Sequence, residues 1–232
     1  MDKKYKHLFF DLDHTLWDFE RNAEETKREM FEILNLKGRG ISSYEVFREK
    51  YIGINLALWA LYREDKIEKD DLNFRRFNDT LLLFDIDDRV LGAKMAEIFI
   101  EGITTKTYLF PFTRELLEYL YPSYTLHIIT NGFEEVQFGK LKNSGLRRYF
   151  SHVITSEAAG AKKPDAEIFQ YALRKTGANA AESLMIGDDL EVDIAGARML
   201  NIDQLYVNHE TKNHSELVTM EVFSLDEIMK LL

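Results

Sequence analysis

The chain has 232 residues, of which 45% are hydrophobic and 30% charged, a composition typical of a globular protein of one large domain or slightly more. Its formal net charge of -10 argues against a general nucleic-acid or membrane-surface binder, because both need a positively charged surface. No apolar stretch approaches the roughly 20 residues of a membrane span. Cysteine is absent, which excludes disulfides and thiolate metal sites, so we expect a cytoplasmic protein without nucleic-acid or membrane partners.

The first predicted element is a buried strand that ends in acidic residues. Residues 8–10 are continuously apolar, as in a parallel strand covered on both faces. Asp11 and Asp13 follow directly, and Thr15 comes two residues later. Open α/β sheets bind ligands at the carboxyl ends of their strands, so these carboxylates are expected at a ligand site. The pattern Asp-x-Asp-x-Thr is too short to be specific alone.

The next part of the chain, residues 19–105, is predicted to contain helices only. Apolar residues recur at helical spacing in two stretches, Ala23, Met30, Ile33 and Leu34 in the first, and Val46, Ile52, Leu56 and Trp59 in the second. Residues 83–89 imitate the opening acidic motif, but they lack its threonine and a strand–helix–strand context. We interpret this stretch as a bend between two helices.

From Pro111 onward, short apolar runs alternate with helical patterns. Strands are predicted over 125–130, 152–156, 183–186 and 204–207, and helices up to about 144 and over 164–176, 192–200 and 224–232. The last helix opens with a capping box of Ser224 and Glu227. Strands joined by single helices form right-handed units of a parallel sheet. We therefore predict a parallel-sheet α/β core built from residues 1–16 and 108–232, with an all-helical insertion over 17–107.

Polar residues follow the second predicted strand and precede one of the later helices. Thr130, Asn131 and Gly132 form a turn that can donate hydrogen bonds to a phosphate oxygen, although such a turn is common for purely conformational reasons. Lys163 stands before Pro164, which favours an extended backbone at the lysine and the start of a helix after it. Taken alone, this lysine is more often an ordinary surface residue.

The strand predicted over 183–186 also leads, through Gly187, into carboxylates. Asp188 and Asp189 follow it, and Asp193 lies in the first turn of the next helix, where an acid also favours the helix dipole. Asp11, Asp13 and Asp188 would gather at one end of the sheet, where they repel one another unless a cation binds or a proton is shared. Mg²⁺ fits such a set of carboxylates with phosphate oxygens. One carboxylate could then attack phosphorus and a second transfer a proton.

In this order, the motifs resemble those of the haloacid-dehalogenase-like hydrolase superfamily. They are Asp11-Leu12-Asp13-His14-Thr15, Thr130, Lys163-Pro164 and Gly187-Asp188-Asp189 with Asp193. The resemblance implies a Rossmann-like core with a helical cap inserted after the first motif. Residues 129–133 and the stretch from Lys163 to Leu173 resemble, more finely, the branch of house-cleaning pyrimidine 5′-nucleotidases.

The resemblance also implies a role for each matching residue. Asp11 would be the nucleophile that forms an aspartyl-phosphate, and Asp13 the acid that protonates the leaving oxygen and then activates water. Mg²⁺ would be held by Asp11, the backbone carbonyl of Asp13, and Asp188. The phosphoryl group would be bound by Thr130, Lys163 and the turn residues Asn131 and Gly132. Asp193 would support these groups from behind, and Asp189 would either bind the metal through water or cap the helix, which we favour.

The leading hypothesis is a Mg²⁺-dependent phosphatase whose small-molecule substrates are nucleoside 5′-monophosphates. A sugar-phosphate phosphatase or phosphomutase would use the same acids. A haloacid dehalogenase would not need Asp13, and a phosphate-accepting receiver module is usually one small domain without an insertion. The insertion is expected to choose the leaving group. Trp17 and Phe19 are candidates for substrate contact, while His209 and His214, in a polar loop, are expected to face solvent.

Overall fold

The computed structural model describes residues 4–232, and the first three residues of the predicted core segment lie outside this range. The chain divides into two compact units. One comprises Met1–Glu20 and Thr107–Leu232, which we call the core unit. The other comprises Arg21–Lys106, which we call the helical unit.

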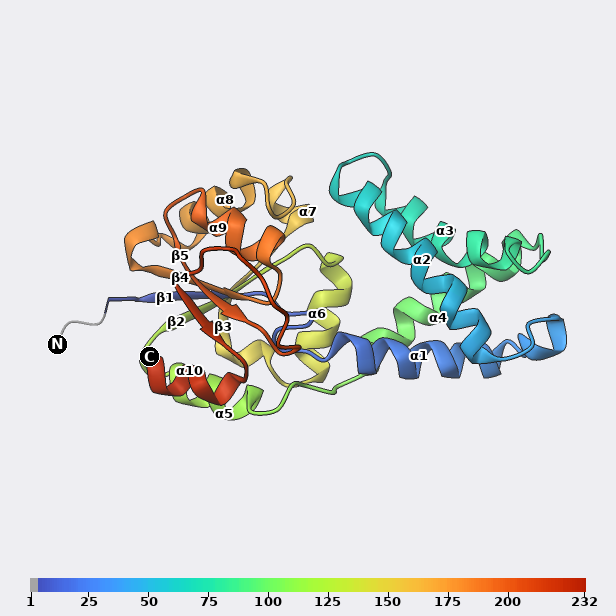
Figure 1. Ribbon diagram of the computed structural model, residues 1–232, viewed down its shortest axis with the longest axis horizontal. Helices are drawn as coiled ribbons and strands as arrows, with labels where there is room; N and C mark the ends of the chain where they lie inside the picture. The colour runs from blue at the N-terminus through green and yellow to red at the C-terminus, as the bar shows by residue number, and fades with distance from the viewer. Residues whose placement is uncertain (1–3) are drawn as a thin grey trace. The chain divides into compact units, whose positions relative to one another are not determined.

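The core unit contains a parallel sheet whose strands lie in the order β3-β2-β1-β4-β5-β6 (Figure 1). The strands are β1 (His7–Phe10), β2 (Thr125–Thr130), β3 (Phe150–Thr155), β4 (Ser183–Gly187), β5 (Asp203–Val207) and β6 (Met220–Val222). Strand β1 lies between β2 and β4, so that Phe10 is opposite Ile128 on one side and Ile186 on the other. The predicted Rossmann-like α/β fold is therefore confirmed.

Helices cover both faces of this sheet. They are α5 (Thr113–Leu120), α6 (Glu134–Asn143), α7 (Ser156–Ala159), α8 (Ala166–Thr176), α9 (Gly196–Arg198) and α10 (Leu225–Leu231). Helices α8 and α9 lie on one face of the sheet, and α5 and α10 lie together on the other (Figure 1). The order in which the strands are added reverses at β1, which β2 and β4 flank on opposite sides, and open α/β sheets bind ligands in the crevice at such a point.

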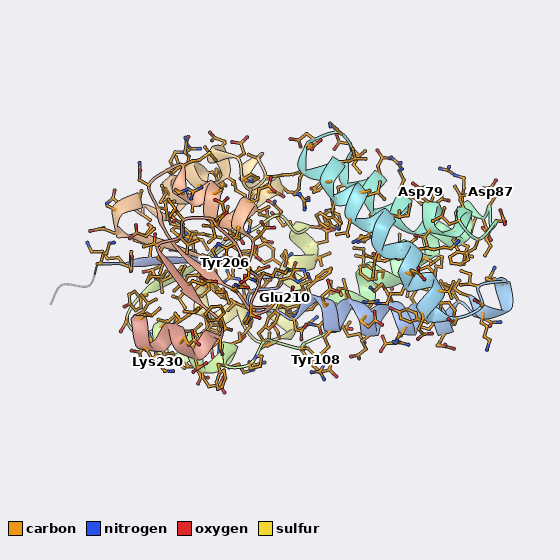
Figure 2. The ribbon with its side chains drawn as sticks, viewed as in Figure 1. Asp79, Asp87, Tyr108, Tyr206, Glu210 and Lys230 are labelled. Atoms are coloured by element: carbon orange, nitrogen blue, oxygen red, sulfur yellow. The ribbon has the colours of Figure 1, made fainter. Side chains whose placement is uncertain are left out.

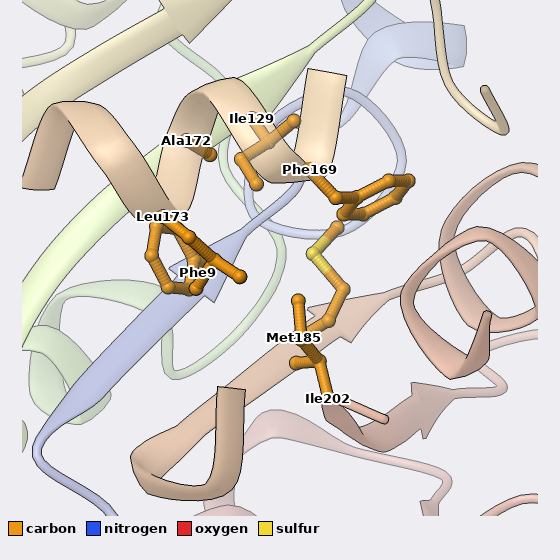
Figure 3. A pocket seen from close by; sticks show the side chains of 7 residues that line it. All are labelled: Phe9, Ile129, Phe169, Ala172, Leu173, Met185 and Ile202. Carbon is orange, nitrogen blue, oxygen red and sulfur yellow. The ribbon is translucent and has the colours of Figure 1, made fainter. Parts of the chain in front are cut away.

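Apolar side chains of α8 seal it onto the sheet. Phe169, Ala172 and Leu173 face residues of the strands (Figure 3). Phe9 of β1 and Met185 of β4 lie beneath them, and the gap that remains is too narrow to admit a water molecule. This packing orients β1 and β4, whose carboxyl ends carry acidic residues.

The ends of the core helices differ in part from the prediction. Helix α8 ends at Gly177, whose φ of 67° is left-handed, but it begins at Ala166 rather than Pro164, because Asp165 caps it by accepting a hydrogen bond from the Glu167 N–H at 2.9 Å. At α10, the predicted capping box is wrong. The Ser224 side chain makes no capping bond, and Glu227 instead accepts from the N–H of Phe223 at 3.2 Å.

The segment predicted as one helix over 192–200 is a π-helix, Leu190–Ala195, followed by the short α9. The Asp189 carbonyl accepts hydrogen bonds from the N–H groups of both Asp193 and Ile194, at 3.0 and 3.2 Å, which widens the turn. Such π-turns are frequent at functional sites. Helix α5 and the three-residue strand β6 had not been predicted individually.

The helical unit contains α1 (Phe19–Ile33, which begins in the core unit), a 3₁₀ turn (Lys37–Arg39), α2 (Tyr44–Arg63), α3 (Lys69–Leu82) and α4 (Arg89–Thr105). This confirms the prediction of helices alone. The acidic stretch 83–89 is a bend, and its Asp88 accepts a hydrogen bond from the Leu91 N–H at 2.9 Å. Within residues 4–232, no helix has the length and apolar character to cross a membrane.

Candidate active site

Three strands deliver polar groups to one edge of the sheet. Asp11 follows β1 directly, and its N–H continues the strand pairing by donating to the Ile186 carbonyl at 2.9 Å. Thr130 is the last residue of β2, and Asp188 follows the last residue of β4. Because the strands are parallel and in register, their carboxyl ends lie together.

A buried lysine joins two of the predicted acidic residues. The Nζ atom of Lys163 lies 2.5 Å from Oδ1 of Asp11 and 2.6 Å from Oδ1 of Asp193, and the lysine side chain is only 2% exposed. A buried ammonium is tolerated when charged partners surround it in this way. These contacts place the ammonium of Lys163 directly beside the carboxylate of Asp11.

Asn131 holds the backbone of this lysine. Its Nδ2 donates to the Lys163 carbonyl and its Oδ1 accepts from the Lys163 N–H, both at 2.8 Å. The predicted role of Asn131 was phosphate binding, but in this structure both polar atoms of its amide bond to Lys163. The neighbouring Gly132 N–H donates to the Thr130 hydroxyl at 3.1 Å, which leaves the hydroxyl hydrogen of Thr130 able to donate to a ligand.

The carboxylates of Asp11, Asp188 and Asp193 form a cluster in which one oxygen of each lies within 4.8 Å of the others. Asp193 reaches the cluster because Gly187 has no side chain. A Cβ at that glycine would lie 2.3 Å from Oδ2 of Asp193. The hydroxyl of Thr15 donates to Oδ1 of Asp188 at 2.7 Å, which ties the loop after β1 to the end of β4.

Burial dominates the electrostatics of this cluster. It raises the pKa of Asp11 well above the usual range, and the charge of Lys163 opposes that shift. Burial and then the charge of Asp193 raise the pKa of Asp188 to about 7. Burial would lower the pKa of Lys163, but the charges of Asp11 and Asp193 raise it above its ordinary value. Burial and mutual repulsion thus disfavour the ionised carboxylates of this cluster beyond what Lys163 offsets, so a further cation would stabilise them.

The donor atoms fit a hard divalent cation such as Mg²⁺. One oxygen of Asp11 bonds to Lys163 and one oxygen of Asp188 to Thr15, which leaves a second oxygen on each carboxylate for a metal. Both oxygens of Asp193 are engaged, by Lys163 and by the Asp189 N–H at 3.2 Å. Asp193 therefore suits a supporting position better than a ligand position. The backbone carbonyl of Asp13 stays a predicted ligand.

Asp189 caps the π-helix and is not part of the cluster of Asp11, Asp188 and Asp193. Its Oδ1 accepts hydrogen bonds from the N–H groups of Glu191 and Val192, both at 2.9 Å. This carboxylate thus caps the π-helix that carries Asp193, which is the simpler of its two predicted roles.

Sequence reasoning missed two residues that hold Asp13. The Nζ atom of Lys140, on α6, lies 2.7 Å from Oδ1 and 2.9 Å from Oδ2 of Asp13, and Gln137 donates to Oδ2 at 2.8 Å. The spacing of α6 contained a signal. Its buried stripe runs through Phe133, Val136, Gln137, Lys140 and Leu141, so a glutamine and a lysine occupy positions that normally carry apolar residues.

Two aromatic residues that follow β1 pack against Lys140 rather than being open to a ligand. Trp17 is fully buried, and its ring lies 4.3 Å from Nζ of Lys140. The ring of Phe19 lies 5.2 Å from the same atom. Their predicted contact with a substrate stays a prediction, but Trp17 has no exposed surface to offer one.

The prediction that His209 and His214 face solvent is wrong. The ring of His209 stacks on Phe110 at 3.9 Å, and its Nε2 lies 3.2 Å from the Thr15 carbonyl. His214 packs edge-on against Tyr206 at 5.2 Å. Figure 2 labels Tyr206 on β5 and Glu210 in the loop that follows it. Both rings are therefore half-buried against aromatic neighbours.

Comparison with known proteins identifies the family of this chain. The family model of haloacid dehalogenase-like hydrolases matches residues 5–201. The chain belongs to this family. It is therefore a hydrolase whose acidic cluster lies at the carboxyl edge of the sheet.

Different relatives of this hydrolase are named for different substrates. The pyrimidine 5′-nucleotidase PynA of Streptococcus pneumoniae is 32% identical over 97% of this chain and 94% of its own length. A glyceraldehyde 3-phosphate phosphatase of Methanothermobacter thermautotrophicus is 28% identical over 97% of each chain. The crystal structure of the putative hydrolase YfnB of Bacillus subtilis, bound to magnesium, has a TM-score of 0.89 and 28% identity, and the match covers 99% of both chains.

Proposed function

We propose that this hydrolase is a Mg²⁺-dependent phosphomonoester hydrolase that acts through an aspartyl-phosphate at Asp11. The observation that carries the proposal is the contact between the buried carboxylate of Asp11 and Nζ of Lys163, at the carboxyl end of the central strand β1. A nucleophilic carboxylate must approach a negatively charged phosphoryl group, so a fixed positive charge beside it lowers the repulsion.

The reaction would use Asp11 and Asp13 in two steps. First, an oxygen of Asp11 attacks phosphorus, the bond from phosphorus to the ester oxygen breaks, and that oxygen keeps the electron pair and takes a proton from Asp13. Next, water attacks phosphorus and gives a proton to Asp13, while the bond from phosphorus to Asp11 breaks and restores the carboxylate. The hydroxyl of Thr130 and the ammonium of Lys163 would stabilise the phosphoryl oxygens in both steps.

Asp11, Asp188 and the backbone carbonyl of Asp13 would hold Mg²⁺. When bound, the ion would offset negative charge on the phosphoryl group and on the acidic cluster. Asp193 would keep Lys163 directed toward Asp11, since it accepts a hydrogen bond from the same Nζ atom at 2.6 Å. The magnesium bound by YfnB supports this part of the proposal.

Pyrimidine nucleoside 5′-monophosphates are the substrates that we propose first. The support is the match to PynA over nearly the whole chain. Sugar phosphates are the second candidate, because the glyceraldehyde 3-phosphate phosphatase matches over the same extent. We further propose that the helical unit is the cap that selects the leaving group, a choice that the core residues do not make.

Phosphate release from a panel of nucleoside monophosphates and sugar phosphates tests this function, with Mg²⁺ and with a chelator. We expect Mg²⁺-dependent release that favours UMP, dUMP or TMP and that Asp11→Asn abolishes. Asp87→Asn is the matched control, because this exposed residue lies in the acidic bend that imitates the opening motif (Figure 2). A preference for sugar phosphates would overturn the substrate, and full activity of Asp11→Asn would overturn the mechanism.

A further inference from the structure

The carboxylate of Asp13 is held by two side chains that no motif contains. Lys140 contacts both of its oxygens, and Gln137 donates to Oδ2 alone. Oδ2 therefore accepts two hydrogen bonds and Oδ1 accepts one. This asymmetry fixes the rotation of the carboxyl group and leaves Oδ1 as the oxygen with capacity for a further partner.

The position of Lys140 is itself closely defined. Its side chain is 2% exposed, whereas that of Asp13 is 20% exposed, so the contact joins a buried cation to a carboxylate that solvent and ligands can reach. The rings of Trp17 and Phe19 face the ammonium at 4.3 and 5.2 Å, where their π-electrons favour a cation. Lys140 thus has little freedom to move away from Asp13.

Gln137 reaches Asp13 through space that a glycine provides. A Cβ at Gly132 would lie 1.6 Å from Nε2 of Gln137 and 2.6 Å from its Cδ, so any larger residue there would displace the amide. Gly132 was expected to bind phosphate. In the structure, the absence of a side chain at Gly132 also leaves room for Gln137, which orients Asp13.

We propose that Lys140, assisted by Gln137, is a positioning residue that directs the carboxyl group of Asp13 for proton transfer to the leaving oxygen. This inference rests on the proposed function, in which Asp13 is the acid. A proton donor must lie within hydrogen-bond reach of the oxygen that it protonates, and a carboxyl group that rotates freely meets this condition only part of the time. Lys140 bridges both oxygens and Gln137 fixes Oδ2, so that Oδ1, which accepts one hydrogen bond fewer, is the oxygen that exchanges the proton.

The dependence on the leaving group separates positioning from a merely structural role. The ribose oxygen of UMP is a poor leaving group that requires a proton, whereas dinitrophenolate leaves without one. The ratio kcat/KM reports only the steps up to departure of the leaving group, so it is not affected by the later use of Asp13 as a base. Loss of positioning should therefore reduce kcat/KM for UMP and spare dinitrophenyl phosphate.

The experiment compares Lys140→Met with Lys142→Met, which removes an exposed lysine from the same helix. We expect Lys140→Met to lose about 100-fold or more in kcat/KM for UMP and less than about 5-fold for dinitrophenyl phosphate, in line with the usual size of general acid catalysis. Lys142→Met should match the wild type on both esters. Gln137→Leu, which keeps the Lys140 contact, should show a smaller loss of the same selectivity, and it serves if Lys140→Met does not fold.

Two results would overturn the inference in distinguishable ways. Equal losses on both esters, or no loss on either, in a variant that melts like the wild type would refute the positioning role and leave the phosphatase intact. A wild-type protein that hydrolyses neither ester would refute the proposed function, and the positioning role with it.

Discussion

Replacement of Lys163 by methionine should cost this protein a large part of its stability. The methionine fills a similar volume but leaves the carboxylates of Asp11 and Asp193 buried without the ammonium that now lies 2.5 and 2.6 Å from them. Removal of one partner from a buried ion pair typically costs about 3–5 kcal/mol. For a chain of this size, about 2–4 °C per kcal/mol gives a decrease in Tm of about 6 to 20 °C.

Thermal and urea unfolding in the presence of a chelator measure this loss. Lys142→Met provides the control for removal of an exposed lysine. A double-mutant cycle with Asp193→Asn tests the cause, because the amide removes a charge that Lys163→Met leaves unpaired. Asp193→Asn should therefore destabilise the wild type but restore stability to Lys163→Met. A loss below about 1 kcal/mol, the range of exposed pairs, or simple additivity of the two changes would refute the argument.

Two further predictions concern a glycine and a histidine. Gly132→Ala should lose about 1–3 kcal/mol of unfolding free energy, because its Cβ would overlap Gln137. Gly53→Ala, at an exposed and unobstructed helix position, should instead gain up to about 1 kcal/mol. Equal stability of the two variants in urea unfolding would contradict this prediction. Burial, then the neighbouring His7 and His152, lower the pKa of His127 to about 3. Below about pH 6.5, the unfolded chain therefore binds a proton at His127, whereas the native state does not. The contribution of neutral His127 to the unfolding free energy is complete above about pH 6.5, and it falls by about 1.4 kcal/mol per pH unit toward pH 3. His127→Gln should flatten this part of the stability curve, and an unchanged slope in urea titrations at successive pH values would count against it.

The sequence was most informative where one local pattern decided the outcome. The strand predicted over 125–130 is β2, Thr125–Thr130, because a short apolar run bounded by a turn has one stable arrangement in a parallel sheet. The C-terminal end of α8 was equally well defined by Gly177, since the left-handed conformation there favours glycine. The motifs at the ends of β1, β2 and β4 followed from the same reasoning.

Contacts between segments far apart in the sequence could not be predicted from such local patterns. Lys140 bonds to a residue that is far from it in sequence, and only the folded sheet brings α6 to the loop after β1. The stacking of His209 on Phe110 has the same origin, and it half-buries a ring that the polar composition of its loop suggests to be exposed. The π-helix at Leu190–Ala195 escaped prediction because its widened turn depends on the shared carbonyl of Asp189, and not on helix propensity.

The central claim is that Asp11 becomes phosphorylated during turnover. Rapid-quench experiments with excess enzyme, radiolabelled UMP and Mg²⁺, followed by peptide mapping of the acid-quenched protein, test it directly. We predict label on the peptide that contains Asp11, formed and lost at rates compatible with phosphate release, and no label in Asp11→Asn. Phosphate release by the wild type with label on another residue, or without any labelled protein at times when turnover is under way, would contradict the account.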